Sequence, residues 1–109
     1  MMDKLLKELQ PLVEAETQRA SEQYGDKYAS AHEAESVLRE EVKELAQDAI
    51  FCSHDMEQIT ANLHLKKDLN GDTESDTTIS KLKSWALDAA AEAIQVAAVC
   101  EKIARGFEK

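Results

Sequence analysis

The sequence predicts an all-α fold, a bundle of three to four helices, and three observations indicate it. Two stretches place apolar residues at alternating steps of four and three, which is the spacing of a heptad seam. The chain has one proline and three glycines among its 109 residues, so little interrupts a helix. No segment alternates apolar and polar residues as a strand does. We expect a single domain over residues 1–109, because a chain of this length has room for one core.

The first helix is expected over residues 3–24. Apolar and aromatic residues recur there at helical spacing: Leu5, Leu9, Leu12, Ala20 and Tyr24. Pro11 lacks the amide hydrogen that a helix interior needs, so it predicts either a kink or a frayed segment before a helix that begins near Pro11. Gly25 predicts the end of the helix, since glycine readily takes the left-handed conformation of a C-terminal cap.

The second helix is expected to begin after Ser30, which forms a capping-box pattern with Glu33. Its seam is predicted at eight positions: Leu38, Val42, Leu45, Ala49, Cys52, Met56, Ile59 and Leu63. The residues 53–55, Ser-His-Asp, also favour a helix boundary, so the element is either one long helix or two.

The third helix is expected after a loop over residues 68–76, with Asp76 as its N-cap. Its seam is predicted at Leu82, Ala86, Ala89, Ala93, Val96, Cys100, Ile103 and Phe107, and Gly106 is predicted to end the helix. Both cysteines fall on these seams, which predicts free buried thiols.

The composition narrows the classes of function. The chain has 22 acidic and 13 basic residues, a formal net charge of −9, which repels phosphate backbones and argues against general nucleic-acid binding. No stretch approaches the ~18 apolar residues of a membrane span. Two cysteines without a CxxC motif favour a reducing compartment, so we expect a cytoplasmic protein without membrane partners.

Acidic residues directly precede the seam positions in both long helices. They form two stripes at helical spacing: Glu41, Glu44 and Asp48 in one helix, and Asp88 and Glu92, continued by the neutral Gln95, in the other. If the seams pack together, the stripes converge, and the repulsion between carboxylates is relieved by a cation. Oxygen ligands of this kind suit Mg²⁺. The alternative interpretation is a pair of solvated flanks that carry no site.

Four segments also resemble a known family: residues 24–25 (Tyr-Gly), 30–34 (Ser-Ala-His-Glu-Ala), 37–45 (Val-Leu-Arg-Glu-Glu-Val-Lys-Glu-Leu) and 92–98 (Glu-Ala-Ile-Gln-Val-Ala-Ala). They look like the MazG-like all-α nucleoside triphosphate pyrophosphohydrolases, in the short form found in phages and bacterial genomes. The resemblance implies a helical bundle completed by self-association as a homodimer or homotetramer. It also implies a Mg²⁺-dependent enzyme that hydrolyses a nucleoside triphosphate to a monophosphate and pyrophosphate.

The family motifs are EExxE on one helix and ExxD on a later one. By resemblance, Glu41 and Glu44 match the first motif, with Glu40 as its leading acid, and Glu92 matches the first acid of the second. This implies that Glu41, Glu44 and Glu92 bind the metal, and that Glu41 or Glu44 is the catalytic base. Gln95 stands where the family has aspartate, which is the main departure from the pattern.

Asp88, one turn before Glu92, is the candidate replacement for the missing carboxylate. Gln95 and Glu40 are expected to contact substrate, as are His32 and Lys43. The alternative to the enzyme is a non-catalytic helical interaction module with a degenerate MazG-like site, which the glutamine at position 95 would favour.

Overall fold

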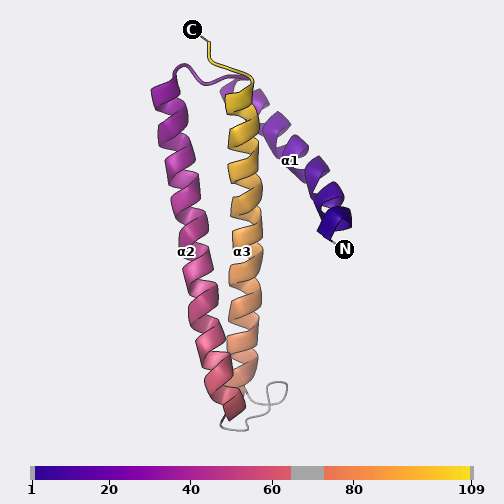
Figure 1. The fold of residues 1–109 in the computed structure, drawn as a ribbon, viewed down its shortest axis with the longest axis vertical. Coiled ribbons are helices and arrows are strands. Elements are labelled where there is room, and N and C mark those ends of the chain that lie inside the picture. The colour runs from indigo at the N-terminus through magenta and orange to yellow at the C-terminus, as the bar shows by residue number, and fades with distance from the viewer. Residues whose placement is uncertain (1, 65–72, 109) are drawn as a thin grey trace. The chain divides into compact units, whose positions relative to one another are not determined.

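The computed structural model describes residues 2–64 and 73–108, without the side chains of residues 61–64 and 73–78. These residues form three helices: α1 (Met2–Tyr24), α2 (Ala31–His64) and α3 (Thr73–Ala104) (Figure 1). The described residues contain no strand beyond an isolated bridge between Tyr28 and Phe107, so the all-α prediction is confirmed. In the same part of the chain, no helix combines the length and apolar character needed to span a membrane.

The chain divides into two compact units. The first joins Met1–Lys43 to Ala91–Lys109, and the second is Glu44–Ala90. The long helices α2 and α3 each contribute one part to the first unit and one part to the second.

Local chemistry sets three helix ends where the sequence predicted them: the end of α1, the start of α2 and the end of α3. Gly25 takes a φ of 96° after α1, and its amide donates a 2.9 Å hydrogen bond to the carbonyl of Ser21. The hydroxyl of Ser30 accepts a 3.2 Å hydrogen bond from the amide of Glu33, which caps the start of α2. Gly106 lies just beyond α3 with a φ of 89°.

The structure differs from the sequence-based predictions at three places in the helices. The helix α1 begins at Met2 and continues through Pro11, so it does not begin near the proline. The helix α2 is unbroken across residues 53–55, and Asp55 is a helix-interior residue that is only 4% exposed. The helix α3 begins at Thr73, ahead of the predicted cap at Asp76, while residues 68–72 of the predicted loop lie outside the described residues.

The buried stripe of α2 is rotated from the predicted seam. Val42 and Met56 are 45% and 49% exposed, and Ala49 is exposed as well. The buried or half-buried positions are Ala34, Val37, Leu38, Glu41, Glu44, Leu45, Asp48, Cys52, Asp55 and Ile59. The acids therefore lie on the inward stripe and not beside it. In α3 the same rotation leaves Cys100 exposed, so the prediction of a buried thiol is wrong there, while Cys52 is half-buried.

The core of the first unit forms where the segment after α1 crosses the ends of α2 and α3. Tyr28, Ala34 and Val99 are buried together, with partly buried apolar side chains around them: Val37, Leu38, Ile103 and Phe107. The carbonyl of Tyr28 accepts a 3.1 Å hydrogen bond from the amide of Glu108, which fixes the C-terminal segment against this core.

In the second unit, α2 and α3 contribute one helical segment each. The rings of Phe51 and Trp85 pack with their centroids 4.4 Å apart. Among the side chains described in this unit, only Asp55 and Ile59 are almost fully buried, at 4% and 5% exposure. Two helical segments alone thus enclose little apolar surface.

Candidate metal and ligand site

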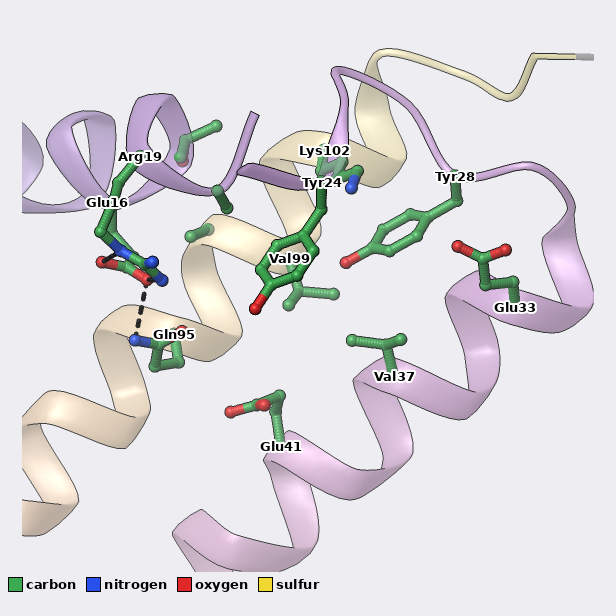
Figure 2. A pocket seen from close by; sticks show the side chains of 13 residues that line it. Glu16, Arg19, Tyr24, Tyr28, Glu33, Val37, Glu41, Gln95, Val99 and Lys102 are labelled. Carbon is green, nitrogen blue, oxygen red and sulfur yellow. Dashed lines mark hydrogen bonds and ion pairs between the residues drawn. The ribbon is translucent and has the colours of Figure 1, made fainter. Parts of the chain in front are cut away.

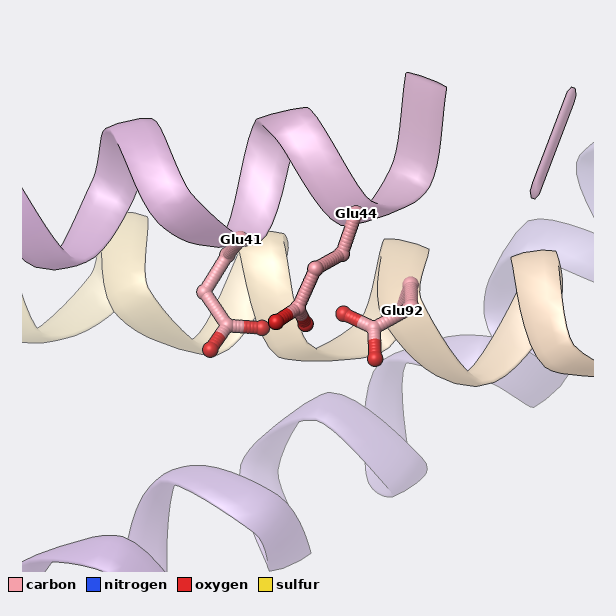
Figure 3. A group of neighbouring side chains, drawn as sticks. All are labelled: Glu41, Glu44 and Glu92. Atoms are coloured by element: carbon pink, nitrogen blue, oxygen red, sulfur yellow. The ribbon is translucent and has the colours of Figure 1, made fainter. Parts of the chain in front are cut away.

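Three carboxylates meet on the inward stripes of α2 and α3. One carboxylate oxygen each of Glu41, Glu44 and Glu92 lies within 4.8 Å of the other two, and all three residues are half-buried (Figure 3). Glu41 and Glu92 belong to the first unit. Glu44 follows Glu41 by three residues in the unbroken helix α2, so helical geometry sets the two side by side. We call these three residues the carboxylate group.

The spacing and chemistry of the carboxylate group fit a small hard cation. Mg²⁺ binds oxygen ligands at about 2.1 Å, so ligands on opposite sides of the ion lie about 4 Å apart. Oxygens within 4.8 Å of one another need only small side-chain adjustments to reach that arrangement. Like charges this close repel each other, and a divalent cation between them would remove the repulsion.

A pocket of about 320 Å³ lies within the first unit, and Glu41 of the carboxylate group lines it (Figure 2). All the residues around it come from α1, the segment after α1, the first turns of α2 and the last turns of α3. Its apolar walls are formed by Ala20, Val37, Ala98 and Val99. The volume lies in the range of pockets that hold small molecules.

One wall of the pocket consists of three hydrogen-bonded side chains: Glu16 and Arg19 of α1, and Gln95 of α3. The side-chain amide of Gln95 donates a 2.9 Å hydrogen bond to Oε1 of Glu16. Arg19 donates through Nε to Oε2 of the same carboxylate at 3.0 Å. The hydrogen bond from Arg19 is the main reason that the pKa of Glu16 lies below its ordinary value; partial burial opposes this shift, and Gln95 adds to it.

The opposite end of the pocket holds a buried cation. Lys102 is 7% exposed, and its Nζ lies 4.2 Å from the centre of the Tyr28 ring. Burial raises the pKa of the Tyr28 hydroxyl, and the negative charges of Glu33 and Glu41 raise it further. Tyr24 lines the same pocket but is 69% exposed.

The structure brings part of the expected site together. Glu41, Glu44 and Glu92 converge as the paired acidic stripes predicted, and Gln95 lines the adjoining pocket. Asp88 is exposed and does not belong to the carboxylate group found among the described residues.

The other expected substrate contacts lie on the surface. Glu40, His32 and Lys43 are all exposed, and none of them lines the pocket. Each is a neighbour in sequence of a residue that lines the pocket or lies on the inward stripe. Their assignment to substrate stays a prediction from the family resemblance.

Of the pocket-lining residues, only Glu41 and Gln95 were among the expected site residues. The residues that were missed include Glu16, Tyr24, Tyr28 and Lys102. The sequence contained one signal for the two tyrosines. They are the only tyrosines in the chain, and both lie within three residues of Gly25. Lys102 also interrupts an apolar stretch near the end of α3, where a buried lysine is unusual. Neither signal reveals that α1 closes the pocket.

Comparisons of the chain with protein-family models, curated proteins and solved structures find no match.

Proposed function

We propose that the chain is a Mg²⁺-dependent nucleoside triphosphate pyrophosphohydrolase of the house-cleaning type, which converts a nucleoside triphosphate to a monophosphate and pyrophosphate. One observation carries the proposal: Glu41 belongs both to the carboxylate group and to the lining of the pocket. A ligand can therefore extend from a metal ion at the carboxylates into a mostly apolar pocket. A nucleotide has this character, with a polyanionic end and an aromatic end.

The three glutamates share one task in this proposal, and one of them has a second. Glu41, Glu44 and Glu92 would hold the ion, which when bound would neutralise phosphate charge and make a nearby water more acidic. Glu41 or Glu44 accepts a proton from the attacking water. Water attacks the α-phosphorus, the bond from this phosphorus to its bridging oxygen breaks, and pyrophosphate leaves with the bonding electrons.

The contact between Gln95 and Glu16 favours a second candidate. The residue at the family's aspartate position is neutral, and its amide is directed to Glu16 in α1. The carboxylate group then has three acids instead of four, unless exposed Asp88 rotates toward it. A non-catalytic helical module with a degenerate site is the alternative that this arrangement supports.

Self-association as a homodimer or homotetramer is part of the proposal. Three large apolar side chains in the second unit are strongly exposed: Ile50 at 67%, Met56 at 49% and Leu87 at 61%. Two packed helical segments cannot cover these residues, whereas the matching face of another copy can.

The activity test uses the purified full chain with a panel of nucleoside triphosphates and Mg²⁺, and pyrophosphate release is measured. We expect release for at least one nucleotide, and a loss of about a hundredfold or more in Glu44→Gln, because Glu44 is a ligand or the base. Glu57→Gln is the matched control, since Glu57 is an exposed glutamate of the same helix outside the carboxylate group. If no triphosphate yields more pyrophosphate than it does with Glu44→Gln, the hydrolase is rejected in favour of the module.

A further inference from the structure

The end of the pocket that holds Lys102 lies well away from the carboxylate group. Lys102 follows Glu92 by ten residues in α3, and at 1.5 Å per residue this is about 15 Å along the helix. In a nucleotide whose phosphates are bound at the carboxylates, the groups attached beyond the phosphates, the sugar and then the base, are therefore expected nearest to that end.

Lys102 is a buried residue whose ammonium is a hydrogen-bond donor without an anionic partner among the described residues. Its side chain is 7% exposed, and within the described part of the chain its ammonium forms no ion pair. The face of the Tyr28 ring offsets part of the cost of burying the charge. A protonated amine can only donate, so a neutral ligand atom that satisfies it must be an acceptor, such as a base carbonyl or ring nitrogen.

Tyr24 provides an aromatic surface at the same pocket. It is the last residue of α1, it lines the pocket, and it is nevertheless 69% exposed. Figure 2 shows its ring projecting into the space that Tyr28 and Val99 also face. An exposed tyrosine beside an apolar pocket gains contact area when a flat ring stacks on it.

We propose that this pocket binds the nucleobase of the substrate, with Tyr24 stacking on the ring and Lys102 donating a hydrogen bond to an acceptor on its edge. The inference deepens the proposed function and rests on it for the identity of the ligand. It makes Tyr24 and Lys102 residues that recognise the base, while the carboxylate group holds the phosphates.

The test measures base binding without the metal and without turnover. The full chain, labelled with ¹⁵N, is titrated in EDTA with AMP, GMP, CMP and UMP, and amide chemical shifts are followed by NMR. Ribose 5-phosphate and inorganic tripolyphosphate are the probes that lack a base. We expect at least one nucleotide to shift the amides near Tyr24, Tyr28 and Lys102, and both baseless probes to leave them unchanged.

Matched variants separate recognition from folding. Tyr24→Ala should weaken binding of the preferred nucleotide about tenfold, because the stacking surface is lost, and Tyr24→Phe should stay within about twofold of the wild type. Lys102→Met keeps the length and apolar stem of the side chain and should weaken binding about tenfold, since a donor to the base is removed. Lys7→Met, at an exposed position of α1, should have no effect.

The outcomes are distinguishable from those of the activity test. Base-dependent shifts without pyrophosphate release would support this inference and reject the hydrolase. Pyrophosphate release without nucleotide-induced shifts at these residues would overturn the inference and leave the hydrolase. Equal binding of ribose 5-phosphate or tripolyphosphate, lost in Lys102→Met, would also overturn it, because Lys102 would then belong to an anion site.

Discussion

The side-chain amide of Gln95 in α3 donates a 2.9 Å hydrogen bond to the carboxylate of Glu16 in α1. The bond ties α1 to α3 within the unit that contains the pocket. An aspartate at position 95, as in the MazG-like motif, would face Glu16 with a second negative charge. The neutral amide of Gln95 therefore suits the carboxylate of Glu16, because it donates a hydrogen bond to it without adding a negative charge.

Gln95→Asp is therefore expected to lower the free energy of unfolding at neutral pH by about 1–2 kcal/mol. It removes a hydrogen bond to a charged acceptor and places two carboxylates together. Urea denaturation followed by circular dichroism measures the change. Gln47→Asp, at an exposed position of α2, controls for the lower helix propensity of aspartate. Equal losses in the two variants would show that the Gln95–Glu16 bond contributes nothing to stability.

The ion pair between Arg19 and Glu16 predicts a pH dependence of stability. The pKa of Glu16 is lower in the folded chain than its ordinary value, mainly because of the hydrogen bond from Arg19. A lowered folded pKa contributes stability above the ordinary glutamate pKa, and this contribution is lost as the pH falls through the folded pKa. Arg19→Met should thus be less stable than the wild type at neutral pH, by a small amount because the guanidinium is solvent-exposed.

The difference between wild type and Arg19→Met should shrink as the pH falls below the ordinary glutamate pKa. Thermal unfolding across a pH series measures it. A difference that stays constant from neutral to acidic pH would contradict the role given to this ion pair.

Glu41→Gln should have opposite effects with and without metal. In EDTA the variant is expected to be more stable than the wild type by about 0.5–1 kcal/mol, because one of three neighbouring negative charges is removed. Added Mg²⁺ should raise the melting temperature of the wild type much more than that of the variant, since binding to the folded state stabilises it. Glu57→Gln should respond to Mg²⁺ like the wild type; an equal response from Glu41→Gln would argue against a metal ligand at position 41.

Ile50→Glu tests the proposed self-association. Ile50 is 67% exposed in the second unit, so a charge there should not disturb the interior of one chain. Sedimentation velocity should show a dimer or tetramer for the wild type and a shift toward monomer for the variant, with helical circular dichroism preserved. A wild-type chain that remains monomeric at high concentration would contradict the proposed self-association.

Much of the fold can be predicted from local sequence signals. Gly25 and Ser30 mark helix ends because their chemistry acts within one turn, and the structure shows both acting as expected. The rotation of the buried stripe could not be predicted in this way. The apolar spacing marks a stripe that includes Val42 and Met56, but it does not say which face packs within the chain, and both residues are exposed.

The acidic residues of the site could also be predicted from the sequence, whereas the pocket beside them could not. The spacing of the acids predicted convergence only if the two seams pack together, with solvated flanks as the alternative. The family resemblance selected Glu41, Glu44 and Glu92, and their carboxylate oxygens do lie within 4.8 Å of one another. The pocket beside them was missed because it depends on α1 crossing the ends of the other two helices. Lys102 and Tyr28 lie 74 residues apart, and only the packing of the first unit brings the ammonium over the ring.

The central claim is that Glu41, Glu44 and Glu92 together hold one divalent ion. Electron paramagnetic resonance with Mn²⁺, which shares the oxygen preference of Mg²⁺, counts bound ions directly on the full chain. The account predicts one saturable Mn²⁺ per chain in the wild type and in Glu57→Gln, displaced by Mg²⁺, and its loss in both Glu41→Gln and Glu92→Gln. Unchanged Mn²⁺ binding in those two variants, or no saturable binding in the wild type, would contradict it.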